Sequence, residues 1–164
     1  PFMFHLTFGM NAAETGLLMT AWPLVIVVAG PLAGTLATKI HPGLLGGVGL
    51  LLMSVGCFLL ADVSPSVGYG GLGARLMLCG FGFGLFQSPN NHLLLSSAPS
   101  YRTGGASGMQ ATARLVGQTT GAALVALLFY LNGDRAPHAA MWLAGGFTLC
   151  GSLVSCSRLR AHRF

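Results

Sequence analysis

The chain has 164 residues, of which 53% are hydrophobic and only 7% are charged, and its formal net charge is +5. A soluble domain typically carries about 25% charged residues, so this composition argues against a soluble fold, which would lack the polar groups to cover its surface. The basic residues are scattered and not interleaved with aromatic ones, which argues against nucleic acid as a partner. We therefore expect an all-α, polytopic transmembrane helix bundle in contact with a lipid bilayer.

The chain opens with residues 1–8 (PFMFHLTF), which are typical of the last turns of a membrane span. There is no initiating Met and no signal-peptide pattern, so we interpret the sequence as the C-terminal fragment of a longer protein. Glu14 stands at the start of the next helix, where the positive end of the helix dipole favours a carboxylate. Capping is the simpler interpretation of Glu14, and proton handling is the alternative.

The first complete span is expected at about 16–38, which is long enough to cross a hydrocarbon core about 30 Å thick. Pro23 and Pro31 each remove a backbone donor, so we expect both to bend this helix. Trp22 either packs in the core or lines a cavity. After a tight basic turn, a second and wholly apolar span is expected at about 44–61.

The third span is expected at about 71–95 and ends in a polar segment that contains Gln87, Asn90 and Asn91. Polar side chains at membrane depth usually face protein or water rather than lipid. Pro89 is expected to kink or open the helix, so that freed carbonyls and the amides can coordinate a substrate or water. The alternative is that the amides simply bind neighbouring helices, and the sequence favours neither interpretation.

The fourth span is expected at about 106–131 and carries Gln110, Arg114 and Gln118. These residues are four apart, so they share one face of the helix. Burying a guanidinium is costly unless it is paired or hydrated. We therefore expect Arg114 to line an internal cavity or bond across a domain interface, in preference to snorkelling to the membrane surface.

Pairs of glycines four residues apart predict close contacts between helices, because a residue without a side chain lets a neighbouring backbone approach. Such pairs occur in three of the expected spans. They are Gly30 with Gly34, Gly80 with Gly84, and Gly117 with Gly121.

The last span is expected at about 139–157, and the distribution of basic residues predicts the orientation of all five spans. Alternating the loops across the membrane puts five basic residues on one side, which the positive-inside rule assigns to the cytoplasm. The carboxyl terminus is then cytoplasmic, and Arg135, with Arg75 as a further candidate, falls on the outer side. The five basic residues are Lys39, Arg102, Arg158, Arg160 and Arg163.

Two stretches resemble a known family. GLLMTAWPLVIVVAGPLAGTLATKIHPGLLGGVG looks like a helix, short cytoplasmic loop and helix from the C-terminal half of a major facilitator superfamily transporter. GFGFGLFQSPNN followed by GASGMQATARLVGQTTGAALVALLF resembles the fourteen-helix drug:proton antiporter branch, which includes multidrug, quaternary ammonium and methyl viologen exporters. The resemblance covers nearly the whole chain, as the last five helices and the end of a sixth.

The resemblance implies candidate gating residues in the loop between the first two spans. Gly34, Lys39 and Gly43 stand where the superfamily's cytoplasmic loop signature has its glycine, basic and final glycine positions, and Thr38 stands where that signature has an acidic residue. It also implies two helix bundles that rock about a central site. The implied partners are the missing N-terminal half, protons and a small-molecule substrate, in a bacterial cytoplasmic membrane.

Three classes of function remain in view. The favoured one is secondary transport, namely proton-coupled efflux of hydrophobic or cationic drugs or biocides. The alternatives to such efflux are transport of another small solute or an inactive, truncated bundle that transports nothing. A membrane enzyme is disfavoured, because the sequence has no HExxH or GxSxG motif and no metal-ligand spacing, and no cofactor is expected. A helper or receptor that reuses the bundle without transporting is the third class.

Overall fold

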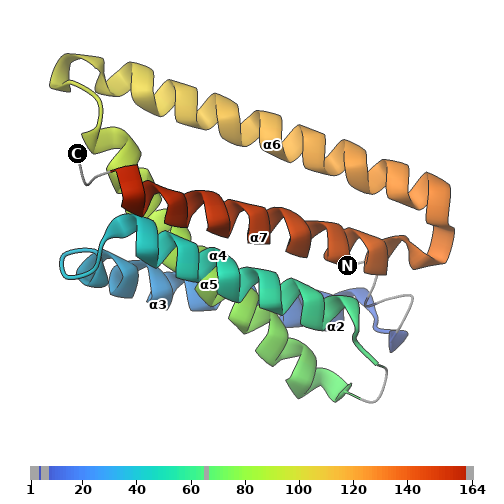
Figure 1. Cartoon of the computed structure of the whole chain (residues 1–164). Coiled ribbons are helices and arrows are strands. Elements are labelled where there is room, and N and C mark those ends of the chain that lie inside the picture. Colours follow the sequence, from blue (N-terminus) through green and yellow to red (C-terminus); the bar gives the residue numbers. More distant parts are fainter. Residues whose placement is uncertain (1–3, 5–7, 65–66, 162–164) are drawn as a thin grey trace.

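The computed structural model describes Phe4 and residues 8–64 and 67–161. Most of the expected end of a preceding span, at 1–8, lies outside these described residues, as does Arg163. The fold class is confirmed, since five helical segments are long and apolar enough to cross a membrane (Figure 1). The elements are α2 (Ala12–Met19), α3 (Ala21–Leu36), α4 (Pro42–Ala61), α5 (Gly68–Ser96), η2 (Ser100–Arg102), α6 (Thr103–Asn132), η3 (Gly133–Arg135) and α7 (Ala136–Ala161).

The first span is interrupted, because α2 ends at Met19 and α3 begins at Ala21. Pro23 has no N–H to donate to the carbonyl four residues earlier, which is that of Met19. The series of backbone hydrogen bonds along the span is therefore weakest where α2 and α3 meet. At its other end, α2 begins with a capping box: Glu14 N–H donates to Asn11 Oδ1 at 2.8 Å, and Asn11 N–H donates to Glu14 Oε2 at 3.0 Å. The interpretation of Glu14 as a capping residue is thus confirmed.

The other two prolines lie inside helices that continue past them. Pro31 is within α3 and Pro89 is within α5, which runs on to Ser96. Of the two outcomes expected at Pro89, a kink or an opening of the helix, the opening does not occur. One missing donor removes a single ladder bond, and Pro89 is buried among its neighbours, which hold the helix together.

Helix α5 is the centre of the bundle and packs closely against α3 on one side and α4 on the other. A Cβ added at Gly80 would lie 2.7 Å from the carbonyl oxygen of Trp22 in α3, and one at Gly84 would lie 2.7 Å from Cβ of Ala29. A Cβ at Gly82 would lie 2.5 Å from the carbonyl oxygen of Gly49 in α4. The close contact predicted for Gly80 and Gly84 is confirmed. Gly82, which lies between them, is on the opposite face of α5 and contacts α4.

The other two glycine pairs do not behave as predicted. Gly30, Gly34, Gly117 and Gly121 have no neighbouring atom within 4 Å of an added Cβ among the described parts of the chain. The predicted contacts at these pairs are therefore wrong within this chain. Both pairs lie on faces of α3 and α6 that no described helix covers.

Helix α4 is joined to α7 by a row of hydrogen bonds that we call the serine seam. Three buried serines donate their hydroxyls to backbone carbonyls of the facing helix. Glycines supply all three of these carbonyls, and the absence of a side chain there lets the two backbones approach. The bonds run from Ser54 to Gly145 (2.8 Å), from Ser152 to Gly47 (2.7 Å) and from Ser155 to Gly43 (2.9 Å).

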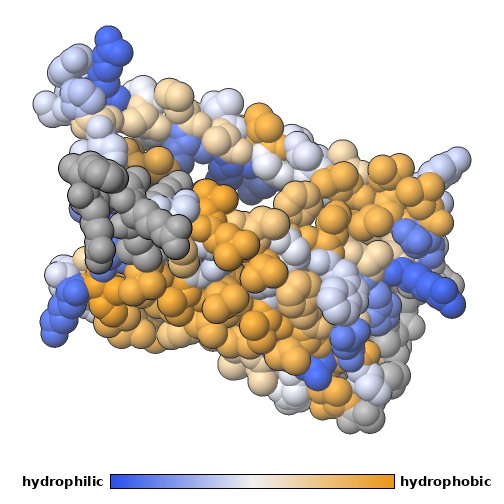
Figure 2. Space-filling view, viewed as in Figure 1, coloured by the Kyte–Doolittle hydropathy of each residue, from blue (hydrophilic) through white to orange (hydrophobic). Residues whose placement is uncertain are grey.

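Helix α6 stands apart from this core. Along its whole described length, from Thr103 to Asn132, no residue is buried. Figure 1 shows α6 as a separate rod that is joined to the bundle at its two ends. The connection to α7 turns at Gly133, whose φ of +52° is a backbone conformation that favours glycine. The space-filling view shows hydrophilic side chains gathered along the side of α6 that faces the bundle, around a hollow (Figure 2).

The connections fall at two ends of the bundle. The α3–α4 turn with Lys39, the η2 segment with Arg102 and the end of α7 lie at one end (Figure 1). The α4–α5 and α6–α7 connections lie at the other end. The segments that carry Lys39 and Arg102 therefore lie at the same end of the structure as the end of α7.

Candidate functional site

A cavity of about 530 Å³ lies between α5 and the first half of α6. This volume is in the range of about 300–1,000 Å³ that small-molecule sites usually have. Its walls are apolar side chains together with amides and one guanidinium. The lining residues are Phe83, Phe86, Gln87, Asn90, Asn91 and Leu94 of α5, and Ala106, Met109, Gln110, Ala113 and Arg114 of α6.

Helical spacing explains why these residues share the cavity. On α5, Phe83, Gln87, Asn90 and Leu94 are separated by three or four residues, so they form one stripe along the helix. The glycines of α5 point this stripe away from α3 and α4, because they occupy the faces that those helices cover. The lining residues of α6 follow the same spacing, so the two stripes face each other across the cavity.

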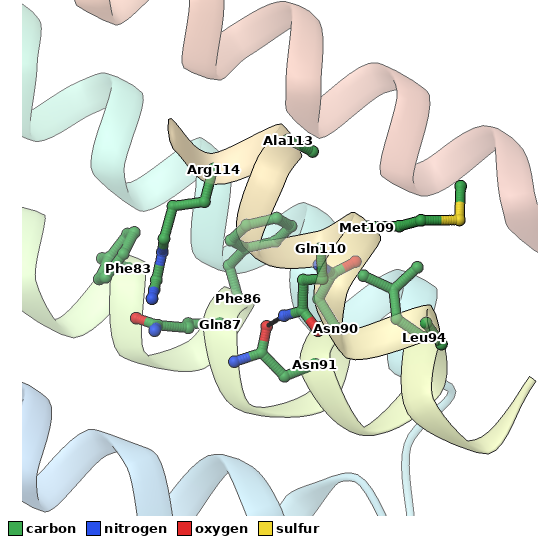
Figure 3. A pocket seen from close by; sticks show the side chains of 11 residues that line it. Phe83, Phe86, Gln87, Asn90, Asn91, Leu94, Met109, Gln110, Ala113 and Arg114 are labelled. Carbon is green, nitrogen blue, oxygen red and sulfur yellow. Dashed lines mark hydrogen bonds between the residues drawn. The ribbon is translucent and has the colours of Figure 1, made fainter. Parts of the chain in front are cut away.

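One hydrogen bond joins the two walls. Nε2 of Gln110 donates to Oδ1 of Asn91 at 2.5 Å, and both side chains are half-buried. It lies toward the end of α5 that carries the connection to α6 (Figure 3). The bond ties α6 to the bundle at a level where few other contacts do so.

Arg114 lies at the deeper end of the cavity, toward the middle of α5. Its side chain extends from α6 toward Phe83 and Gln87 of α5 (Figure 3). Within the described residues its guanidinium makes no hydrogen bond or ion pair, and the side chain is exposed to the hollow. A guanidinium stays charged at any physiological pH, so this cavity carries a permanent positive charge that water or a ligand must solvate.

Five of the seven predicted pathway residues come together here, namely Gln87, Asn90, Asn91, Gln110 and Arg114. The other two do not line the cavity. Trp22 belongs to α3 and packs against the cluster of buried core residues, and its ring lies 6.3 Å from that of Phe83, which does line the cavity. Gln118 is exposed one turn beyond Arg114 on α6, past the part of that helix that lines the cavity.

The apolar wall of the site, above all Phe83 and Phe86, was not predicted from the sequence. A signal was available for Phe83, because it precedes Gln87 by four residues and so belongs to the same stripe. The same signal marks Leu94, which follows Asn90 by four residues, whereas no comparable signal marks Met109, an ordinary apolar residue of a membrane helix.

The predicted gating residues lie away from the cavity. Gly34 and Lys39 are exposed, the first in α3 and the second in the turn after it. Gly43 is not a loop residue, since it is buried in the first turn of α4, where its N–H donates to Nδ1 of His41. A Cβ at Gly43 would lie 3.2 Å from the carbonyl oxygen of Ser155, so this glycine is explained by the contact with α7.

The lining residues offer groups that can bind a small molecule. Amides and a guanidinium donate hydrogen bonds, and two phenyl rings offer surfaces for stacking. Among the described residues no group of three or more His, Cys, Asp or Glu could hold a metal ion, and the lining contains no nucleophile paired with a base.

Comparison with known proteins agrees with the helical pattern. The sequence profile described as Major Facilitator Superfamily matches residues 1–163. The chain is 46% identical over 163 residues to the uncharacterized transporter YebQ of Escherichia coli (strain K12), covering 99% of this chain and 36% of YebQ. No solved structure matches the chain significantly.

Two more distant relatives have names that mention a substrate. The riboflavin transporter RibZ of Clostridioides difficile (strain 630) is 31% identical over 133 residues, which cover 79% of this chain and 28% of RibZ. The multidrug resistance protein Stp of Mycobacterium tuberculosis (strain ATCC 25618 / H37Rv) is 28% identical over 135 residues, 79% of this chain and 24% of Stp. The chain thus spans about a third or less of the length of these relatives.

Proposed function

The chain belongs to the Major Facilitator Superfamily, a family of transporters rather than enzymes, and on that premise we propose that it forms the C-terminal part of a proton-coupled exporter. The proposed substrates are hydrophobic or cationic drugs or biocides. The other half of the transporter would supply the second bundle, because alternating access requires two bundles around one site.

The observation that carries this proposal is the polar cavity between two apolar spans. Amides and a guanidinium within a membrane bundle are costly unless they face a pathway or a partner, and Gln87, Gln110 and Arg114 face the α5–α6 cavity. The cavity reaches from the middle of α5 to the end that carries η2. If that end faces the cytoplasm, the cavity is placed to take up an intracellular compound.

The proposed orientation has the carboxyl terminus in the cytoplasm. It rests on the positive-inside rule and on Lys39 and Arg102, which lie at the same end of the bundle as the end of α7. The compartment proposed is the bacterial cytoplasmic membrane, supported by the bacterial origin of the relatives.

Proton coupling is proposed to reside mainly outside this chain. Its three acidic residues are Glu14, Asp62 and Asp134. Glu14 is engaged in the capping box of α2, and Asp62 caps the end of α4. Both stand at helix ends, where a carboxylate cannot carry protons through the bilayer centre.

The name of RibZ supports a second candidate, the export or import of another small aromatic solute. One experiment separates the two. The complete protein that carries this chain is placed in liposomes with an acidic lumen, and uptake of ethidium and of riboflavin is followed. Ethidium accumulation that stops when the gradient is collapsed supports drug export, and riboflavin accumulation alone supports the second candidate.

The matched variants for this assay are Gln87→Ala and Gln118→Ala. Both remove one amide, but only Gln87 lines the cavity. We expect Gln87→Ala to slow uptake and Gln118→Ala to leave it near the unchanged rate. Absence of gradient-driven movement of both compounds would contradict the proposed function.

A further inference from the structure

The α5–α6 cavity carries positive charge and no negative charge among its lining residues. Among its lining residues Arg114 is the single charged one, and neither a carboxylate nor a thiol is present. The rest of the polar lining consists of the amides of Gln87, Asn90, Asn91 and Gln110. Inside a low-dielectric bundle an uncompensated charge acts over several ångströms, since water screens it poorly.

The position of the guanidinium suits a ligand rather than a structural bond. Arg114 reaches into the space between α6 and α5, toward Phe83 and Gln87 (Figure 3), and no described residue pairs with it. Arginine presents a planar fork of donors that matches a carboxylate, and this geometry gives two parallel hydrogen bonds. The phenyl rings of Phe83 and Phe86 line the same cavity and provide apolar faces for a flat ring system.

We propose that this cavity binds planar aromatic compounds through an anionic group, such as a carboxylate, that pairs with Arg114. The inference rests on the proposed transport function, but it assigns this cavity an anionic substrate class in place of the cationic compounds proposed above. A cationic compound would meet a like charge at Arg114, so its positive end would need a partner outside this cavity. The volume of about 530 Å³ accommodates a drug-sized ring system together with its acidic group.

The experiment uses two dyes with the same xanthene skeleton and opposite charge, fluorescein (anionic) and rhodamine 123 (cationic). Binding of each to the complete protein in detergent is measured by fluorescence polarisation, with no ion gradient present. We expect fluorescein to bind more tightly than rhodamine 123. Arg114→Gln should weaken fluorescein binding by about tenfold or more, as expected for the loss of a charge-assisted hydrogen bond, and should not weaken rhodamine 123 binding.

Two further variants distinguish a direct effect on binding from an effect on folding. Arg102→Gln removes the same charge from an exposed residue next to α6, outside the cavity, and should leave both affinities unchanged. Gln87→Glu adds a carboxylate of nearly the same shape inside the cavity, and should weaken fluorescein while strengthening rhodamine 123. If Arg114→Gln does not yield folded protein, the Gln87→Glu result decides.

The proposal is overturned if rhodamine 123 binds more tightly than fluorescein to the unmodified protein. It is also overturned if Arg114→Gln or Gln87→Glu changes both affinities in the same direction and degree. Failure of the proposed function has a different signature. If fluorescein binding depends on Arg114 but no gradient-driven transport is seen, the proposed anion site in this cavity is supported and the proposed export function is contradicted.

Discussion

Gln110 of α6 donates a hydrogen bond to Asn91 of α5, and this bond holds the detached helix against the bundle across the cavity. The two residues are 19 positions apart in the sequence, on either side of η2. Because no residue of α6 is buried along its described length, a single polar pair contributes more to the position of this helix than it would in a packed core.

The first prediction concerns that pair. In membrane bundles an interhelical side-chain hydrogen bond contributes about 0.6 kcal/mol on average and at most about 1.7 kcal/mol. We expect the double-mutant cycle of Asn91→Ala and Gln110→Ala to give a coupling energy within this range, measured from thermal unfolding in detergent. Gln118→Ala in place of Gln110→Ala is the control and should show no coupling to Asn91→Ala.

The second prediction tests the crossing of α5 and α4. A Cβ at Gly82 would meet the carbonyl oxygen of Gly49 at 2.5 Å and the backbone nitrogen of Met53 at 2.7 Å. Backbone atoms cannot move aside as a flexible side chain can, so Gly82→Ala should destabilise the protein by about 1–3 kcal/mol. Gly146→Ala, whose added methyl has no described atom within 4 Å, should leave the melting temperature nearly unchanged.

The third prediction tests the serine seam. Ser152→Ala and Ser155→Ala each remove one hydroxyl bond to α4, and each should lower stability by about 0.6 kcal/mol, because the facing carbonyl keeps its bond within its own helix. Ser157→Ala is the matched control, since that hydroxyl donates only within α7, to Val154. A loss in the control as large as in the seam variants would contradict the role of the seam.

The fourth prediction tests orientation by cysteine labelling. The four cysteines of this chain, and any in the rest of the complete protein, are first replaced by alanine or serine. Single cysteines are then introduced at Ser100 and at Asp62, which lie in connections at opposite ends of the bundle. A reagent that does not cross membranes should label Asp62→Cys in intact cells. It should label Ser100→Cys only in inverted vesicles. The reverse pattern would overturn the proposed topology.

Much of the fold was predictable, because hydropathy and the length of a span are properties of the local sequence. The same is true of the amide stripe, since Gln87 and Asn90 lie on one face of any helix that contains them. Contacts between helices were harder to predict from the sequence. The row GFGFG predicts close approach, but the sequence does not say that Gly82 faces α4 while Gly80 and Gly84 face α3.

The errors share a physical cause. Gly34 and Gly117 have the spacing of contact glycines, yet no described helix covers their faces, and a spacing rule cannot reveal whether a partner is present. Of the two pathway candidates that do not line the cavity, Trp22 packs against the buried core, which the sequence left open as an alternative, and Gln118 lies one turn beyond the lining of α6. No pattern in the sequence marks Ser152 or Ser155 as contact residues, because isolated serines are common in membrane helices.

The serine seam also sets an order of events during synthesis. Its three bonds join residues 91, 105 and 112 positions apart, so α4 enters the bilayer long before α7 has left the ribosome. During that interval Ser54 and the glycine carbonyls of α4 lack their eventual neighbours. The bundle can close on this side only after α7 has been synthesised and inserted, and a ribosome stalled before α7 would leave α4 open to other membrane proteins.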